Sequence, residues 1–330
     1  MNSKKANWAF LITIIGYFVM VIVIGMFFPF VIDDLVLGNL ACEAVVVLPV
    51  LIFALASKEK LISFLGFRRI KFRSVLMIGL FTFLSMPVLS LLNLFTQFWV
   101  KNEIADTLGS QQGKIPFTLM YLSVGIIAPV FEEIACRGAY YRSYCKSGSA
   151  FKAMMLSAVI FALVHMNFNQ AAYAFIMGIF AVLLVEATGS LWASVLYHGF
   201  INGSQVILLY TVLEEGVDAY SENMALTPEL LMCAIGVYVI FTAVTLPLAW
   251  AVLVWIGRTE GRSQILSDLW TKRKQRMPHA AGHSDVKEKK DKMVTLPFLL
   301  AVAICLVVMT GFIGIILEQI VQLIFMRLAS

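Results

Sequence analysis

Long apolar runs separated by short polar loops dominate this sequence of 330 residues. A helix of about 20 apolar residues is long enough to cross the roughly 30 Å of hydrocarbon in a membrane. Hydrophobic residues make up 60% of the chain and charged residues only 14%, a balance that is unusual for a soluble domain. The sequence therefore predicts an all-α, polytopic bundle of about eight to nine transmembrane helices.

The first apolar run is longer than the apolar core of a secretory signal, and no small-residue cleavage site follows it. We therefore expect the chain to keep this run as a membrane span. Nine runs of this kind can be counted along the sequence. They cover about residues 8–31, 37–56, 75–99, 117–146, 151–165, 170–185, 191–210, 230–256 and 294–325.

The positions of Lys and Arg predict the orientation of the chain, because cytoplasmic loops carry an excess of both. The loop 58–73 holds six of them, and the loop 258–292 holds ten. The loop after the seventh run carries acids and no cation: Glu214, Glu215, Asp218 and Glu222. With nine spans, the N-terminus should therefore be cytoplasmic and the C-terminus should lie outside.

The five cysteines are scattered through apolar segments without any C-x-x-C spacing. This pattern disfavours both disulfide bonds and a zinc site made of thiolates. They are Cys42, Cys136, Cys145, Cys233 and Cys305.

Three charged residues lie inside the fourth apolar run. Glu132, Glu133 and Arg137 would each cost about 2.5 to 3.5 kcal/mol at the centre of a membrane if left unpaired. Glu133 and Arg137 are four residues apart, so on a helix they can pair, which leaves Glu132 free for a second partner. Pro129 lies just before the acids and should bend the helix there. A buried ion pair that only fixes packing is the less favoured interpretation, because the second acid would be needlessly costly.

Two of the four histidines, His165 and His198, also fall inside apolar runs. Each alone would usually be a hydrogen-bonded core residue. His198 and Asn202 are four residues apart and share one helix face, while His165 follows Phe161 by the same spacing.

These acids, histidines and the asparagine are groups that hydrolysis can use. A buried carboxylate can take a proton from water, and His and Asn can donate hydrogen bonds to the oxyanion that forms. No G-x-S-x-G or S-x-x-K pattern is present, and Cys136 is a disfavoured nucleophile. The residues thus predict a hydrolase without a covalent nucleophile.

Three motifs carry a resemblance to a known family. They are Glu132-Glu133-x-x-x-Arg137, Phe161-x-x-x-His165 and His198-x-x-x-Asn202, in this order on successive apolar runs. Together they resemble the motifs of the CAAX protease and bacteriocin-processing family, also called CPBP or Abi, which includes the Ras-converting CAAX endopeptidases. The resemblance covers about residues 116–210 and divides the chain into N-terminal spans (1–115), a four-helix catalytic core (116–210) and C-terminal spans with a basic loop (211–330).

The resemblance implies a glutamate-dependent intramembrane endopeptidase. Glu132 with His165 would activate water, and His198 with Asn202 would hold the oxyanion. Glu133 and Arg137 would position these groups and neutralise charge. No cofactor is expected. A metal at Glu132, His165 and His198 is a less favoured alternative, because Arg137 would compete for the acids.

The expected partners are a hydrophobic or prenylated peptide and membrane lipid, and a membrane protein is a further candidate. The net charge of +5 does not indicate binding to nucleic acid, because the basic residues lie in short loops beside spans. The basic loop 258–292 could bind anionic lipid. The alternative function is a non-catalytic immunity or scaffold protein, which would not need the complete polar set. A proton-coupled transporter is disfavoured because no internal repeat is detectable.

The site should open toward the cytoplasm, although the two histidines differ in expected depth. At 1.5 Å per residue, His198 lies about 10 Å and His165 about 20 Å from the cytoplasmic ends of their spans. Glu43 and Glu318 are further acids in apolar runs, for which local pairing is favoured over lining the site.

Overall fold

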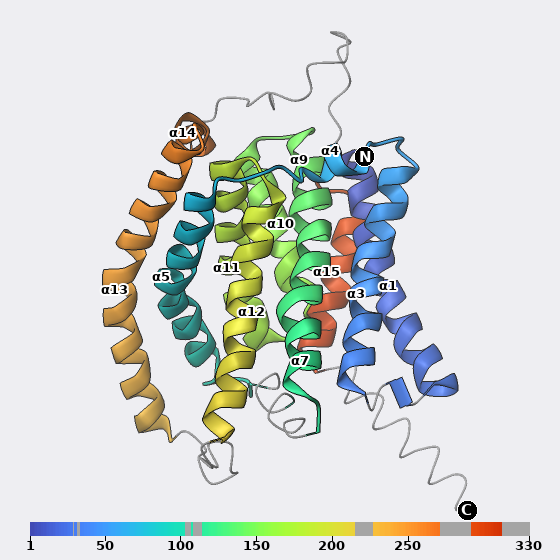
Figure 1. Ribbon diagram of the computed structural model, residues 1–330. Coiled ribbons are helices and arrows are strands. Elements are labelled where there is room, and N and C mark those ends of the chain that lie inside the picture. Colours follow the sequence, from blue (N-terminus) through green and yellow to red (C-terminus); the bar gives the residue numbers. More distant parts are fainter. Residues whose placement is uncertain are drawn as a thin grey trace, which may run out of the picture.

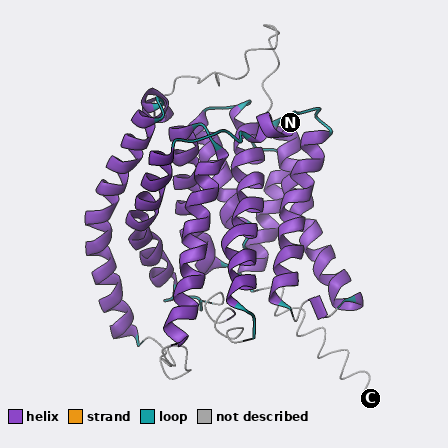
Figure 2. Ribbon diagram, in the orientation of Figure 1, coloured by secondary structure: helices purple, strands orange, loops and turns teal. Residues whose placement is uncertain are grey.

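A computed structural model describes residues 1–28, 30–31, 34–102, 107, 114–214, 227–270 and 292–311. Within these ranges the regular structure is helical and contains no strand (Figure 2). The elements are α1 (Ser3–Phe27), α3 (Leu35–Leu55), α4 (Leu61–Leu65), α5 (Phe72–Thr96), α7 (Phe117–Met120), η1 (Tyr121–Ile127), α8 (Ala128–Glu133), η2 (Ile134–Tyr141), α9 (Arg142–Cys145), α10 (Ala150–Leu163), α11 (Phe168–Thr188), α12 (Leu191–Glu214), α13 (Pro228–Thr259), α14 (Ser263–Trp270) and α15 (Leu296–Met309).

Six helices in the described part of the chain are long and apolar enough to cross a membrane. They are α1, α3, α5, α11, α13 and the continuous helix Phe117–Cys145, which is built from α7 through α9. Helix α12 has 24 residues but carries the polar side chains of the third motif, and α10 and α15 have 14 residues each. The all-α, multi-pass membrane fold is thus confirmed. The count of nine spans stays a prediction, since residues 312–330, with Glu318, lie outside the described residues.

The helices run side by side as one bundle (Figure 1). Helix α13 packs on α5 at one edge, α1 packs on α3 at the other, and α11, α12 and Phe117–Cys145 lie between them. The short helices α4, α9 and α14 lie at the same end as the N-terminus. The described parts of the cation-rich connections, residues 58–73 and 258–270, therefore lie at one end of the bundle.

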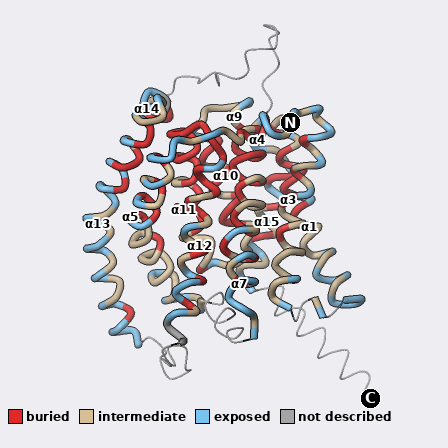
Figure 3. Tube along the Cα trace, in the orientation of Figure 1, coloured by how far each residue is buried: buried red, intermediate tan, exposed pale blue. Residues whose placement is uncertain are grey.

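Burial rises from the edges of the bundle toward its centre (Figure 3). In the most apolar part of α11, 67% of the residues are buried, whereas in α13 only 17% are. Helix α13 is apolar on all sides, and its outer face exposes side chains such as Ile240 and Val244. An exposed helix that is apolar on all sides is suited to contact with lipid. The polar residues of the three motifs lie instead on, or directly after, the central helices.

The helix Phe117–Cys145 is irregular on both sides of its two acids. Tyr121–Ile127 and Ile134–Tyr141 are π-helical, and Pro129 lies just after the first of these segments. Because Pro129 has no N–H, it cannot donate to the carbonyl of Val124 or of Gly125 in the preceding turn. The distortion that Pro129 predicts is therefore present, as a widened turn directly before the acids.

Candidate active site

An ion pair between Glu133 and Arg137 forms the centre of the site. Arg137 Nη1 lies 2.7 Å from Glu133 Oε1, and both side chains are fully buried. The two residues are one turn apart on the same helix, as the spacing predicts. Arg137 Nε and Nη2 have no hydrogen-bond partner among the described residues. The guanidinium instead lies over the ring of Phe161, with Cζ 4.2 Å from the ring centroid.

His198 is the third member of this buried group. Its Nδ1 lies 3.1 Å from the same oxygen of Glu133 that binds Arg137. A carboxylate paired with arginine only accepts hydrogen bonds, so Nδ1 of His198 must be the donor. The other ring nitrogen, Nε2, then carries a proton only when the ring is an imidazolium. Glu133 therefore fixes both the orientation and the proton position of His198.

His165 lies in the turn that follows α10. Its Nδ1 is 2.6 Å from the carbonyl oxygen of Phe161, which accepts the hydrogen bond. That carbonyl belongs to the last turn of α10, where carbonyls lack partners within the helix. The Phe161-x-x-x-His165 spacing thus lets the histidine cap its own helix. The neutral ring then presents an unprotonated Nε2, which lies 3.7 Å from Glu132 Oε2.

Glu132 and Glu133 are neighbours in sequence but occupy different environments. The side chain of Glu133 is inaccessible, whereas those of Glu132 and His165 are 12% and 13% exposed. Glu132 Oε2 has no hydrogen-bond partner among the described residues, since 3.7 Å is too long for a direct bond. One carboxylate is thus fixed by buried partners, and the other faces a histidine without a direct hydrogen bond to it.

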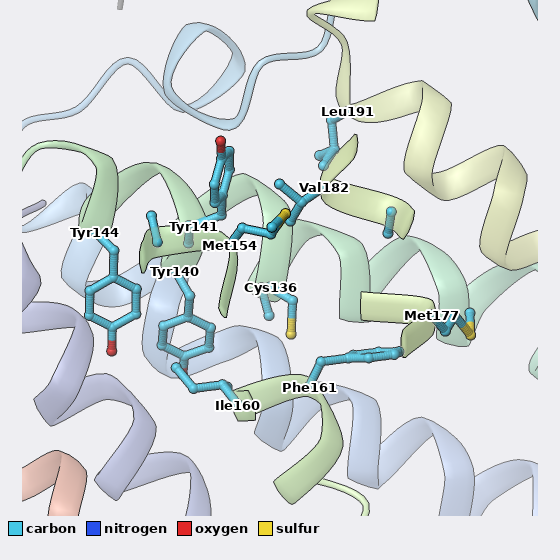
Figure 4. Packing of buried hydrophobic residues seen from close by; sticks show 14 of the residues in the cluster. Cys136, Tyr140, Tyr141, Tyr144, Met154, Ile160, Phe161, Met177, Val182 and Leu191 are labelled. Atoms are coloured by element: carbon cyan, nitrogen blue, oxygen red, sulfur yellow. The ribbon is translucent and has the colours of Figure 1, made fainter. Parts of the chain in front are cut away.

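Phe161 links the two halves of the site. Its ring stands edge-on to that of His165, with centroids 5.0 Å apart, and to that of His198, at 5.6 Å. Its flat face also contacts Arg137. In Figure 4 its side chain lies in the buried cluster beside Cys136. The sequence predicts an aromatic neighbour for His165, but it does not show that this ring also touches the other two groups.

Asn202 shares a face of α12 with His198 and reaches the widened turn of the acidic helix. Its Nδ2 donates a hydrogen bond of 3.2 Å to the carbonyl of Val124. This is one of the carbonyls that Pro129 cannot satisfy. The amide has two N–H groups, so one remains for another acceptor. Among the described residues, no hydrogen bond joins Asn202 directly to Glu132, Glu133 or Arg137.

The expected span 151–165 needs a correction. Helix α10 has only 14 residues, about 21 Å, so it is shorter than the hydrocarbon layer. It ends at Leu163, and the chain turns back through Met166, which has a φ of 50°. His165 therefore lies at a recessed helix end. His165 and His198 nevertheless lie in the same region of the bundle, because both rings contact Phe161.

The remaining candidate groups were a metal site and a cysteine nucleophile. Among the described residues, no three His, Cys, Asp or Glu side chains are arranged to hold a metal ion. Glu133 is engaged by Arg137 and His198, and a metal at Glu132, His165 and His198 stays a less favoured prediction. All five cysteines are free, and Cys136 is buried in the core.

Glu43 of α3 is a residue whose position the sequence analysis did not predict. Instead of pairing locally, its buried carboxyl faces Glu132 across the packed helices α3 and α8. The sequence shows that Glu43 is an acid inside an apolar run, but it does not show which residue of another helix the acid faces.

Comparison with known proteins agrees with the three motifs. Residues 114–204 match the model of the type II CAAX prenyl endopeptidase Rce1-like family, and this segment includes all six polar positions. A segment of 108 residues is 26% identical to YdiL of Bacillus subtilis (strain 168), which carries the provisional name of a membrane peptidase. That match covers 33% of this chain and 44% of YdiL, so it spans less than half of the relative. No solved structure matches the chain. The resemblance is thus confirmed for the central segment, and it supports a membrane protease of the CAAX type.

Proposed function

We propose that this chain is a glutamate-dependent membrane endopeptidase, from the likeness of residues 114–204 to type II CAAX prenyl endopeptidases. The observation that carries the proposal is the pair formed by Glu132 Oε2 and His165 Nε2, which lie 3.7 Å apart on side chains that are each only partly buried. Beside it, Arg137 and His198 hold the second acid. The substrate is a prenylated or hydrophobic peptide at the membrane.

Glu132 and His165 are suited to activate water. Both present acceptors, since His165 Nδ1 is committed to the Phe161 carbonyl. One water molecule can donate a hydrogen bond to each, which directs its lone pair toward a substrate carbonyl carbon. As the new C–O bond forms, the water proton moves to Glu132 and the carbonyl π electrons move to oxygen. When the C–N bond breaks, that proton goes to the leaving nitrogen, which releases a carboxylic acid and an amine.

His198 and Asn202 would stabilise the oxyanion between these two steps. His198 donates from Nε2 only as an imidazolium, with its Nδ1 directed at the Glu133 carboxylate. Asn202 donates through the N–H that Val124 does not use. Removal of one donor from such a site typically costs about 100- to 1,000-fold in kcat.

The orientation of the site belongs to the same proposal. Residues 58–73 and 258–270, the described parts of the cation-rich connections, lie at the end of the bundle that carries the N-terminus, so we place that end in the cytoplasm. We propose that the site opens toward this end. A peptide anchored by a lipid chain could present its cleavable bond there.

The test compares the purified wild type with Glu132→Gln on farnesylated and unmodified hydrophobic peptides, with and without a chelator. Loss of a general base should lower kcat by about 100- to 10,000-fold. Glu229→Gln is the matched control, because Glu229 is an exposed acid at the start of α13. Cleavage by Glu132→Gln at the wild-type rate would contradict the proposed mechanism. If no protein cleaves any peptide while Glu132→Gln keeps its cellular effect, a scaffold role replaces the peptidase.

A further inference from the structure

Glu43 is a buried acid that the mechanism above does not use. It lies in the middle of α3, and only 5% of its surface is exposed. Its Oε2 has no hydrogen-bond partner among the described residues, and neither has Oε2 of Glu132. An acid in an apolar span without a cationic partner carries a large free-energy cost. The groups that surround Glu43 therefore indicate its role.

The packing of α3 directs Glu43 at the site. Helix α3 lies along η1, α8 and η2, the segments around the two acids. One turn before Glu43, the Asn39 side chain donates a hydrogen bond of 3.0 Å to Ser123 Oγ, which fixes α3 against η1. This packing makes the carboxyl groups of Glu43 and Glu132 neighbours, and each has a buried oxygen without a hydrogen-bond partner among the described residues.

Two carboxylates cannot hydrogen-bond to each other, because neither has a donor. A contact between them in a buried site therefore requires one shared proton. His165 and Tyr173 also face Glu132, whereas the other titratable neighbours of Glu43 are the thiols of Cys42 and Cys136. Glu43 has the more apolar and less exposed surroundings, so the proton belongs on Glu43.

We propose that Glu43 is a positioning residue of the hydrolytic site, which carries one proton and donates it in a hydrogen bond to the Glu132 carboxylate. This inference rests on the proposed peptidase function. The hydrogen bond occupies one oxygen of Glu132 and leaves the other free toward His165. Glu43 thus acts on the reaction through Glu132 and does not itself touch the substrate.

Two substitutions separate hydrogen bonding from packing. Glu43→Gln keeps an N–H donor toward Glu132 and should retain kcat within about twofold. Glu43→Leu fills the same space without a donor, so kcat should fall about tenfold with little change in KM. The acid limb of the pH profile should also move to higher pH, because a hydrogen bond to the charged form favours that form. Val47→Ala, a buried position on the same helix, should lower the melting temperature without moving the pH profile.

An infrared measurement tests the same contact without turnover. At pH 7 the difference spectrum of wild type minus Glu43→Gln should contain the C=O band of one protonated carboxyl group. In Glu132→Gln this band should persist at a shifted frequency, because the carboxylate acceptor has gone. A difference spectrum without the band would overturn the inference, as would a Glu43→Leu variant with wild-type kcat and pH profile. Failure of the peptidase proposal would appear separately, as cleavage by Glu132→Gln.

Discussion

The guanidinium carbon of Arg137 lies 4.2 Å from the centroid of the Phe161 ring, deep inside the bundle. The same ring meets both histidines of the site edge-on. A cation over an aromatic face is attracted to the ring, and the attraction grows when water is excluded. The ring of Phe161 therefore sets the relative positions of Arg137, His165 and His198 through contacts that are not hydrogen bonds.

Replacement of Phe161 by Leu should impair the site more than the fold. The substitution keeps an apolar side chain and the backbone carbonyl that binds His165, but it removes the ring from Arg137. We expect a loss of about 2 kcal/mol of stability, the value of a buried cation–π contact, together with a fall in kcat of at least tenfold. Thermal unfolding in detergent and peptide cleavage would measure the two effects. An unchanged kcat would show that the ring does not position the histidines.

The Glu133–Arg137 pair calls for a double-mutant cycle. Arg137→Met leaves the Glu133 charge buried without its partner, so the free energy of unfolding should fall by about 3 to 5 kcal/mol. The double variant Glu133→Gln with Arg137→Met removes both charges and should recover much of that loss. Equal stability of the single and double variants would contradict a buried, charged pair.

The six polar site residues could be predicted from the sequence, because charged and polar side chains are conspicuous inside apolar runs. Their spacing also predicts the pair Glu133–Arg137, since one helical turn brings the two side chains together. Contacts between helices do not follow from spacing. The position of Phe161 against His198, and of Glu43 against Glu132, depends on how the helices pack.

Irregular helices account for the other features of the site that the sequence did not predict. The sequence shows an apolar run around residue 160 but does not show that α10 stops at Leu163, because no Gly or Pro marks that end. Pro129 predicts a distortion, but the π-helical form and the partner of the Val124 carbonyl depend on α12. The division into three segments and the roles of the site residues remain predictions for experiment.

A close crossing of two central helices gives a further prediction. A Cβ atom on Gly125 would lie 3.2 Å from the Cα of Gly203 on α12, and backbone cannot move aside easily. Gly125→Ala should therefore separate the helices and cost about 1 to 3 kcal/mol. Gly236→Ala in α13 is the control, because nothing lies within 4 Å of its Cβ position. That change should be neutral or stabilise the helix by up to about 1 kcal/mol. Equal melting temperatures for the two variants would contradict the crossing.

The free energy of unfolding should depend on pH through Glu59, which lies in the connection between α3 and α4. Burial raises the pKa of Glu59, but hydrogen bonds from Lys146, at 2.6 Å, and from the amino-terminal group outweigh it and hold the pKa below its ordinary value. The stabilisation is complete above the unfolded pKa of about 4.3 and is lost as the pH falls through the lower folded value.

The effect should be below about 1 kcal/mol, because the pair is partly solvated. The difference in unfolding free energy between wild type and Glu59→Gln, measured at pH 7 and pH 3, should shrink toward zero at the lower pH. Lys146→Met should weaken this pH dependence in the same way. A difference that is the same at both pH values would exclude the pair as its source.

Pro129 offers a test of whether the widened turn serves the site. Pro129→Ala restores an N–H that can donate to the carbonyl of Val124 or Gly125, so the helix should become more regular and gain up to about 3 kcal/mol. Asn202 would then compete for its acceptor, and the acids would shift relative to α12. We expect a higher melting temperature and a lower kcat. Pro247→Ala, in the exposed helix α13, should give a similar gain without loss of activity. If Pro129→Ala keeps full activity, the irregular turn is a packing feature and does not position the acids.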